Sequence, residues 1–268
     1  MKRKIAVIGV GNMARSIISG IVSSSLPIEK IFLYDKAEAA CDSYRNNSDF
    51  VIASSIKDAV CDADCVLLSV KPQNFPEVLS EISLTSKCSE KLYISIAAGI
   101  TSESVSSALG GAVVIRVLPN LPMTIGKGVC AICKNYNADN EDFSFVNDVF
   151  SSAGNTIIID EIEMNRIIGV TSSSPAYVFK FIDAICKGAS AQGLDGDSLL
   201  DAVCDMVIGS ALLLKKSPDS PSQLISKVAS KGGTTERALL QLDEGGFEGV
   251  IESAMKACTA RADELGKQ

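Results

Sequence analysis

The stretch KIAVIGVGNMA near the start constrains the fold of this chain more than any other. An apolar, β-branched run is broken by Gly9 and Gly11, and a helical pattern follows at once. A strand, a glycine turn and a helix in this order are typical of a dinucleotide-binding βαβ unit, and Ala14 completes the GxGxxA spacing. The first glycine permits the tight turn, the second lets the backbone approach a pyrophosphate, and the small third residue lets helix pack on strand. Gly9, Gly11, Asn12 and Met13 are therefore predicted to bind the cofactor where the helix begins.

Short apolar runs alternate with helical patterns from this strand onward. KIFLYD, CVLLSV, LYISIAAG, AVVIRVLPN and NTIIID are typical of strands, and the continuous apolar character of CVLLSV suits a strand buried on both faces. Repeated strand, helix, strand units predict an α/β domain with a parallel, doubly wound Rossmann-type sheet and right-handed crossovers. We therefore expect residues 1–160 to form a dinucleotide-binding domain.

The chain after residue 160 carries helical patterns only, which predicts an all-α domain over residues 161–268. Ser174 before Pro175 is typical of a helix N-cap followed by a proline in the first turn. The long helical patterns are apolar on more than one face, especially at VIGSALLL. Such helices are expected to bury against a partner subunit as well as within their own domain, so we predict a homo-oligomer.

The composition excludes several classes of protein. A net charge of −7 and the lack of a long basic run argue against binding to nucleic acid. The apolar stretches are too short to span a bilayer and the N-terminus has no signal-peptide pattern, so we expect no membrane association and a cytoplasmic location. Because the chain contains no histidine, Ser-His-Asp and Cys-His hydrolysis are excluded, and a cofactor that carries the chemistry becomes attractive.

The nine cysteines are scattered through apolar context, which favours reduced thiols over a disulfide framework. Cys130 and Cys133 have the CxxC spacing of metal and redox motifs, but no second pair and no histidine accompany them. On a strand these two side chains would point to opposite faces. We therefore predict structural packing and no metal site.

Asp35 ends the second predicted strand, at the distance from the glycine turn where an acidic side chain accepts hydrogen bonds from the adenosine ribose. A carboxylate there weakly favours NAD, because it repels the 2′-phosphate of NADP. Lys36 beside it would soften this preference, so both cofactors stay open. The alternative role for Asp35 is that of a solvated turn residue.

Two further strands end in SVKPQ and SIAAGI. Open α/β sheets bind ligands at the carboxyl ends of their strands. The residues at these ends are therefore expected to line the cofactor: Val70, Lys71, Pro72, Ala97 and Ala98. A plain surface position is the alternative for Lys71.

Four stretches together carry a family resemblance: GVGNMA, SVKPQ, RVLPNLP with GVTSSSPAYVF, and KVASKGGTTERAL. In this order and spacing the sequence resembles the pyrroline-5-carboxylate reductases, which reduce a cyclic imine to L-proline with NAD(P)H in the last step of proline biosynthesis. The resemblance implies a Rossmann domain joined to a helical domain that interleaves with its partner in a homodimer, often assembled into larger rings. Substrate would bind between the cofactor of one subunit and the helical domains of the dimer.

The resemblance also implies roles for particular residues. Gly232, Gly233 and Thr234 would form the loop that contacts the small-molecule substrate, and Thr235 would hydrogen-bond the imine nitrogen. Glu161 lies where relatives place a glutamate that faces the substrate.

The two glycines of this loop also suggest how it would bind an anion. Backbone N–H groups of Gly232 and Gly233 would form a nest for the substrate carboxylate, and Ser230 would add a donor. A plain Gly-Gly turn between helices is the alternative.

Several positions depart from the family pattern. Ser172 and Ser174 stand where glycines often occur, Asn165 replaces a common aspartate, and Lys231 takes the place of a frequent proline. Relatives that use NADP often carry a small hydroxyl residue at the position of Asp35, so this departure leaves the choice of cofactor open.

Two functions are alternatives to an imine reductase. A β-hydroxyacid dehydrogenase also joins a Rossmann domain to helices, but Lys180 and Lys187 lack the KxxN setting of its catalytic lysine. A catalytically silent protein that senses NAD(P) would have no need for the hydroxyl of the GGTT loop.

Overall fold

The computed structural model describes residues 2–133 and 137–267. The chain divides into two compact units. Unit 1 comprises Met1–Pro175 and Met255–Gln268, and unit 2 comprises Ala176–Ala254. These units describe compactness only, so the expected division into a dinucleotide-binding domain (1–160) and a helical domain (161–268) stays a prediction.

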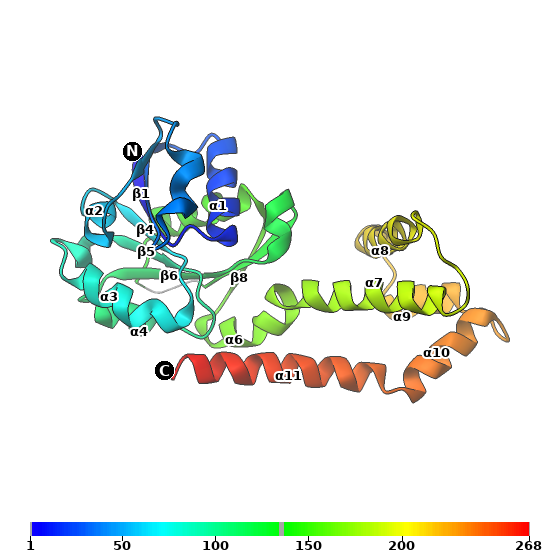
Figure 1. Ribbon diagram of the computed structural model, residues 1–268. Helices are drawn as coiled ribbons and strands as arrows, with labels where there is room; N and C mark the ends of the chain where they lie inside the picture. Colours follow the sequence, from blue (N-terminus) through cyan, green and yellow to red (C-terminus); the bar gives the residue numbers. More distant parts are fainter. Residues whose placement is uncertain (1, 134–136, 268) are drawn as a thin grey trace. The chain divides into compact units, whose positions relative to one another are not determined.

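Unit 1 is built on a sheet that has eight strands across the described residues, in the order β3-β2-β1-β4-β5-β6-β7-β8 (Figure 1). The strands are β1 (Arg3–Ile8), β2 (Ile28–Tyr34), β3 (Phe50–Ile52), β4 (Cys65–Leu68), β5 (Leu92–Ser95), β6 (Val113–Leu118), β7 (Gly128–Cys133) and β8 (Gly154–Ile159). Neighbouring strands are parallel except β6 and β7. The predicted Rossmann-type fold is therefore confirmed, with one antiparallel pair added. Residues 119–127 join these two strands, and so short a connection cannot make the crossover that parallel strands need.

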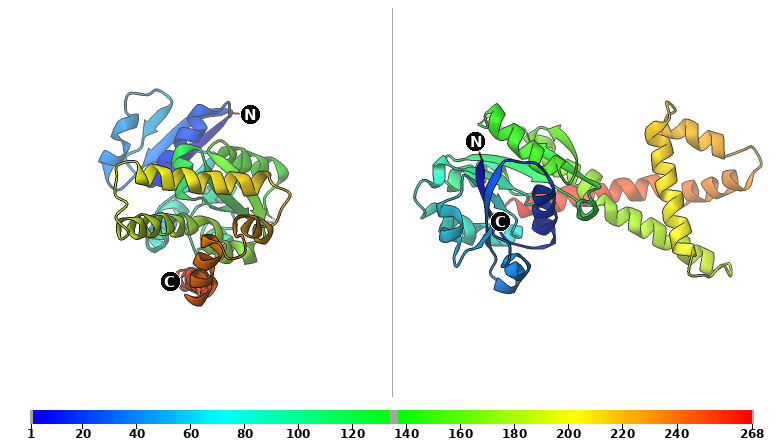
Figure 2. Two further views of the ribbon diagram at one scale, coloured as in Figure 1. Left: turned by 90° about the vertical axis from the view of Figure 1, so that its right-hand side faces the viewer. Right: turned by 90° about the horizontal axis from the view of Figure 1, so that it is seen from above.

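Helices cover both faces of the sheet in unit 1 (Figures 1 and 2). They are α1 (Asn12–Ser23), α2 (Ile56–Cys61), α3 (Phe75–Ser83), α4 (Ser102–Ala108) and α5 (Asn140–Ser151), with short 3-10 turns η1 (Glu38–Tyr44), η2 (Pro72–Asn74), η3 (Cys88–Glu90) and η4 (Leu121–Ile125). One core cluster packs α1 and α5 on the sheet, and a second packs α2, α3 and α4 on the opposite face.

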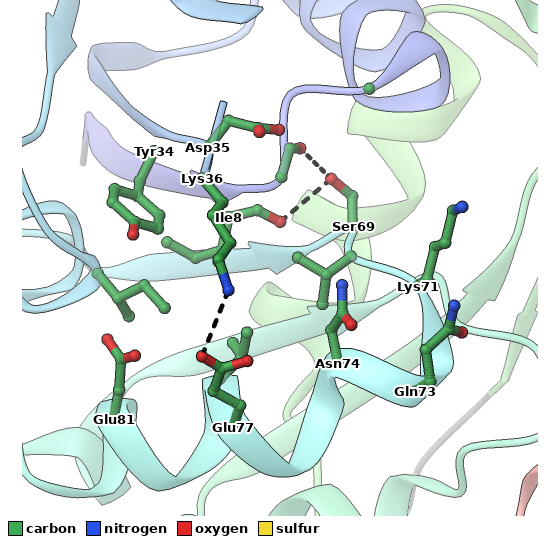
Figure 3. A pocket seen from close by; sticks show the side chains of 15 residues that line it. Ile8, Tyr34, Asp35, Lys36, Ser69, Lys71, Gln73, Asn74, Glu77 and Glu81 are labelled. Atoms are coloured by element: carbon green, nitrogen blue, oxygen red, sulfur yellow. Dashed lines mark hydrogen bonds and ion pairs between the residues drawn. The ribbon is translucent and has the colours of Figure 1, made fainter. Parts of the chain in front are cut away.

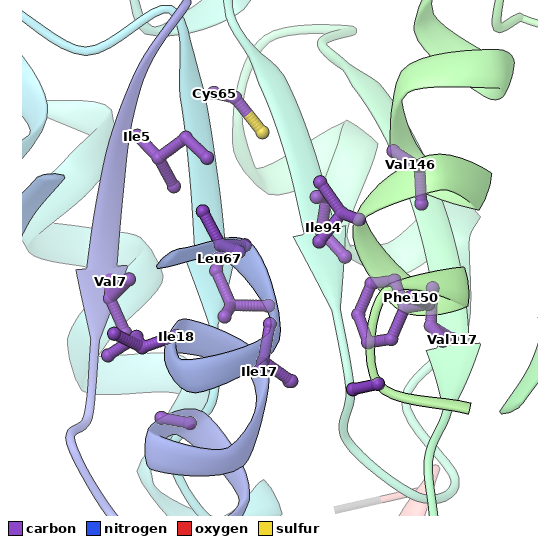
Figure 4. Close-up of a cluster of buried hydrophobic side chains, with 14 of the residues drawn as sticks. Ile5, Val7, Ile17, Ile18, Cys65, Leu67, Ile94, Val117, Val146 and Phe150 are labelled. Carbon is purple, nitrogen blue, oxygen red and sulfur yellow. The ribbon is translucent and has the colours of Figure 1, made fainter. Parts of the chain in front are cut away.

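The strand sequences explain this division between two cores. Successive side chains on a strand point to opposite faces. Val7 and Leu67 thus contribute to the core under α1 and α5, shown in Figure 4, whereas Ala6 and Val66 contribute to the other. The central strands are apolar throughout because both of their faces are covered.

Cys130 and Cys133 lie on β7 and belong to different clusters, one with Met123 and the other with Glu161. The prediction that they face opposite sides of a strand is confirmed. Burial raises the pKa of both thiols to about 12, which is the behaviour of packed rather than reactive cysteines.

Helical elements follow β8 with little interruption. They are η5 (Glu161–Glu163), α6 (Met164–Ile167), the π-helical turn η6 (Ile168–Ser172) and α7 (Ser174–Ser190). The predicted N-cap at Ser174 is wrong, because Ser174 is already the first residue of α7 and its hydroxyl donates to the carbonyls of Gly169 and Val170. The π-helical turn η6 thus ends only two residues before α7 begins, and Ser174 lies inside the helix that it was expected to cap.

The described part of unit 2 is helical, as predicted. After α7 come α8 (Leu199–Lys216), α9 (Pro221–Val228) and α10 (Thr234–Glu244), and α11 (Phe247–Leu265) leads back into unit 1. Large apolar side chains of unit 2 are exposed in the single chain, including Phe179, Phe181, Met206, Ile208 and Leu213. Within residues 2–133 and 137–267, no helix combines the length and apolar character needed to cross a membrane.

Candidate functional site

A cavity of about 470 Å³ lies in unit 1 at the carboxyl ends of β1, β2 and β4 (Figure 3). Its volume is in the range of small-molecule and cofactor sites. Of the residues predicted to bind the cofactor, the cavity brings together Gly9, Gly11, Asp35, Val70 and Lys71. The glycine turn, the acidic residue after β2 and the loop after β4 thus meet at one site.

Gly9 makes the turn after β1 with a φ of +92°, which side chains rarely adopt. A Cβ at this position would lie 2.9 Å from the carbonyl oxygen of Ser69. The Ser69 hydroxyl donates to the carbonyls of Gly9 and Ile8, and the Gly9 N–H donates to the Tyr34 carbonyl at 2.8 Å. The first glycine therefore allows three adjacent strands to approach closely at the floor of the cavity.

Gly11 is the N-cap residue of α1, and no side chain caps this helix. A Cβ at Gly11 would meet no protein atom within 4 Å. The space in front of the uncapped N–H groups of α1 is thus left open by the protein, which fits the pyrophosphate of a dinucleotide. The nicotinamide cofactor expected from the sequence therefore fits the residues present.

Asp35 directs its carboxylate at two backbone groups. Oδ2 accepts the N–H of Val10 at 2.7 Å, and Oδ1 accepts the N–H of Ala37 at 2.9 Å. The side chain thereby fastens the glycine turn to the end of β2. Since each carboxylate oxygen can accept more than one hydrogen bond, a ribose hydroxyl can still be accommodated.

The cavity also contains residues that the sequence motifs did not indicate. Tyr34, Ile56 and Val78 supply apolar and aromatic surface, whereas Glu77 and Glu81 come from α3. The two glutamates are four residues apart, so they share a helix face, and that spacing was the available signal. The cavity further includes Ile8, Lys36, Ser69, Gln73 and Asn74.

The other predicted cofactor residues do not line this cavity. Asn12 and Met13 begin α1, and Pro72 begins η2 directly after Lys71. Ala97 is buried in the core beneath α2, α3 and α4, and Ala98 packs against the cluster that includes α6. Their contact with a cofactor stays a prediction.

Glu161 lies in a cluster of donors within unit 1. Its carboxylate accepts Nη1 of Arg116 at 2.6 Å, the Ser102 hydroxyl at 2.9 Å and the Cys133 thiol at 3.1 Å. Burial raises the pKa of Glu161, but the Arg116 charge and these hydrogen bonds outweigh it, and the pKa lies below its usual value. Asn165 accepts Nη2 of the same arginine at 3.1 Å. These contacts favour an anchoring role, and the predicted contact with substrate stays a prediction.

The glycine loop of unit 2 has a defined geometry. Gly232 has a φ of +74°, and its N–H donates to Oε2 of Glu236 at 2.7 Å. The Gly233 N–H donates to the Ser230 carbonyl at 2.9 Å, and a Cβ at Gly233 would lie 2.9 Å from that same oxygen. Both glycines are thus needed for the shape of the loop. Both glycine N–H groups already donate to acceptors in or next to the loop. From the sequence, we instead expected them to be available to a substrate carboxylate.

Gly233 is the N-cap of α10, and Thr234 and Thr235 are the first two residues of this helix. N–H groups in a first turn have no intrahelical acceptor. The loop therefore presents a hydroxyl and helix-terminal N–H groups at Thr235.

The Rossmann-type sheet and the cavity at its glycine turn are typical of proteins that bind a dinucleotide, a class that includes the nicotinamide-dependent oxidoreductases. In agreement, residues 4–99 match the family model described as NADP oxidoreductase, coenzyme F420-dependent, and residues 161–265 match the model for pyrroline-5-carboxylate reductase dimerisation. The chain is 32% identical to the pyrroline-5-carboxylate reductase of Corynebacterium melassecola over 98% of both chains, and 33% identical to that of Escherichia coli over the full length of both. The chain belongs to the pyrroline-5-carboxylate reductase family.

Solved structures agree with this assignment. The pyrroline carboxylate reductase of Plasmodium falciparum with NADP bound is 27% identical, with a TM-score of 0.88 over 98% of each chain. The Streptococcus pyogenes enzyme is 29% identical, also with a TM-score of 0.88, over 98% of this chain and 99% of its own. A 3-hydroxyisobutyrate dehydrogenase of Mycobacterium tuberculosis, at 15% identity and a TM-score of 0.51, shares only the fold.

The family assignment confirms the resemblance, the fold class and the class of enzyme expected from the sequence. The protein is an NAD(P)H-dependent oxidoreductase, and the match to the dimerisation model supports a homo-oligomer that acts on a small molecule. The NAD preference expected from Asp35 is not confirmed.

Proposed function

We propose that this protein reduces 1-pyrroline-5-carboxylate to L-proline with NAD(P)H, the last step of proline biosynthesis. One observation carries the proposal: the chain aligns along 97–100% of its length with enzymes named for this reaction, at 30–34% identity. The cavity described above supports it, because it offers a cradle for the cofactor on which the reaction depends.

The bound nicotinamide would supply the hydride, which the imine carbon accepts. The protein must then position the substrate and polarise its C=N bond. Thr235 would hydrogen-bond the imine nitrogen, because a hydroxyl can donate to a neutral imine or accept from a protonated one. Since the chain has no histidine, the proton on nitrogen would come through a hydroxyl or from water.

The substrate carboxylate needs donors as well. The N–H groups of Gly232 and Gly233 are already engaged, so binding to them would require displacement of the Glu236 carboxylate from Gly232. We favour the first-turn N–H groups of Thr234 and Thr235, where the positive end of the α10 dipole stabilises an anion. The hydroxyl of Ser230 would add a further donor.

We propose a weak preference for NADH over NADPH. Asp35 supports it, because its carboxylate lies at the end of β2 in the cavity and would repel a 2′-phosphate. The preference is tested by the specificity constants for the two cofactors at saturating imine. A clear advantage of NADPH would refute it.

The assembly is proposed to be a homodimer with interleaved helical domains, extended to a ring of dimers. Exposed apolar side chains on α7 and α8, such as Phe181 and Leu213, support a partner surface in unit 2.

The decisive experiment follows the oxidation of NADH and of NADPH in the presence of pyrroline-5-carboxylate. Turnover that produces proline is the expected result. The six-membered cyclic imine and a 3-hydroxy acid with the oxidised cofactor serve as alternative substrates. Tight cofactor binding without turnover of any imine would instead favour a sensor of NAD(P), and turnover of the 3-hydroxy acid alone would favour a β-hydroxyacid dehydrogenase.

A further inference from the structure

Charged side chains from β2, α3 and the loop after β4 line the cofactor cavity. Asp35 and Lys36 follow β2, and Glu77 and Glu81 lie one turn apart on α3. Lys71, after β4, also lines the cavity, but it points away from Glu77 in Figure 3. Three carboxylates against two ammonium groups leave the charged lining of this cavity net negative.

Lys36 lies next to the position where the ribose of the cofactor is expected. It directly follows Asp35, the residue proposed to meet the ribose hydroxyls, and NADPH differs from NADH by a phosphate on one of those hydroxyls. Figure 3 shows the lysine side chain extending from the end of β2 toward α3. Its Nζ lies 3.8 Å from Oε1 of Glu77.

The ion pair between Lys36 and Glu77 has little to contribute to folding. The two side chains are 88% and 65% exposed, and an exposed pair typically contributes less than about 1 kcal/mol to stability. Because the pair lies at a binding cavity, it can instead affect how strongly Lys36 attracts a ligand. A lysine engaged by a carboxylate attracts a phosphate less, and charges within about 10 Å still interact at ordinary ionic strength.

We propose that Glu77 is a specificity-determining residue that disfavours NADPH by engaging Lys36, the cation available to the 2′-phosphate. This inference rests on the proposed NAD(P)H-dependent function and assigns a role to a residue on α3, outside the glycine turn and the β2 terminus. Glu77 acts on cofactor choice and has no part in hydride transfer.

The test measures dissociation constants for NADH and NADPH on the full-length protein, from the change in cofactor fluorescence on binding. Glu77→Gln keeps the shape of the side chain and removes its charge. The variant should bind NADPH about fivefold more tightly, the effect of one exposed charge pair, with NADH affinity unchanged within about twofold. The matched control is Glu90→Gln, which removes the same charge from an exposed pair with Lys87 at 3.4 Å outside the cavity. It should change neither constant.

A second comparison isolates the role of the lysine. In a Lys36→Met background, Glu77→Gln should no longer improve NADPH binding, because no cation remains to be released. The inference is overturned if Glu77→Gln behaves like Glu90→Gln, or if its full gain persists without Lys36.

These outcomes are separate from those that test the proposed function. Binding constants need no turnover, so a protein that binds both cofactors but reduces no imine refutes the proposed function and leaves the role of Glu77 testable. Conversely, an active imine reductase whose NADPH affinity ignores Glu77 refutes this inference alone.

Discussion

At the scale of single residues, the two glycines of the β1–α1 turn have different tasks although they are two positions apart. Gly9 is required by its positive φ and by the nearby Ser69 carbonyl, so the fold itself depends on it. Gly11 has an ordinary φ of −74° and open space around it, so only a ligand needs it to be small.

The two glycines can be separated by substitution. Gly9→Ala should lower the free energy of unfolding by about 1–3 kcal/mol, because alanine is strained at this φ and meets backbone. Gly11→Ala should leave stability within about 0.5 kcal/mol. It should weaken cofactor binding about tenfold, because the added methyl group would enter the space where we expect the pyrophosphate. Urea denaturation and cofactor titration of both variants check this, and equal losses of stability would contradict it.

Thr235 is the residue that we propose polarises the imine. Thr235→Ala should reduce kcat about 100-fold, the typical effect of a lost catalytic hydrogen bond, while cofactor affinity persists. Thr235→Ser keeps a hydroxyl and should retain most of the activity. Steady-state rates of both variants with pyrroline-5-carboxylate test this role. Full turnover by the alanine variant would show that Thr235 is not catalytic.

At the scale of elements, the pair between Arg116 on β6 and Glu161 on η5 ties the sheet to the helical segment that follows it. The arginine side chain is 2% exposed, so removal of its partner leaves a buried charge uncompensated. Asn165 extends the link, because its amide donates to Asp263 on α11 at 2.7 Å. Arg116 thus joins β6 to η5 and α6, and Asn165 extends the link to α11.

Glu161→Gln should therefore destabilise the protein by about 2 kcal/mol at neutral pH. This is less than the ~3–5 kcal/mol of a fully buried pair, because the Glu161 side chain is 35% exposed. Because its pKa is lowered on folding, the carboxylate stabilises the protein above its unfolded pKa, and this contribution disappears as the pH falls through the folded value. The difference between wild type and variant should thus shrink below pH ~4. Denaturation across this range measures it, with the exposed Glu103→Gln as control; a difference that does not change with pH would contradict it.

The sequence predicted the features whose cause is local. Three features could be predicted because each depends only on neighbouring residues. They are the glycine turn, the acidic residue after β2 and the apolar strands that alternate with helices. The antiparallel β7 could not, since it follows from the length of a connection between two strands. The Arg116–Glu161 pair joins residues 45 positions apart and leaves no local pattern. The engagement of Gly232 by Glu236 depends on a side chain that folds back over the loop, which a nest motif does not predict.

At the scale of the whole molecule, the exposed apolar side chains of unit 2 lie within the segment that matches the dimerisation model, and we propose that they form the partner surface. Leu213→Glu places a charge on this surface and should shift the protein toward monomer at micromolar concentration, because a desolvated charge is costly at an interface. The control is Leu84→Glu, on a leucine that is 81% exposed at the end of α3 in unit 1. Sedimentation velocity distinguishes the two. A stable wild-type monomer, or equal behaviour of both variants, would contradict the assignment of this surface.

Unit 1 is discontinuous, and this constrains how it can fold. Residues from its second segment pack within it: Gly99 and Gly266 have touching backbones, and Ala262 belongs to a cluster with Leu118 and Met164. Because residues 176–254 lie between the two segments, a long loop must close before these contacts form, and the contacts must offset the entropy of that closure. Unit 1 should therefore fold more slowly than a sheet of the same kind that is built from one continuous segment.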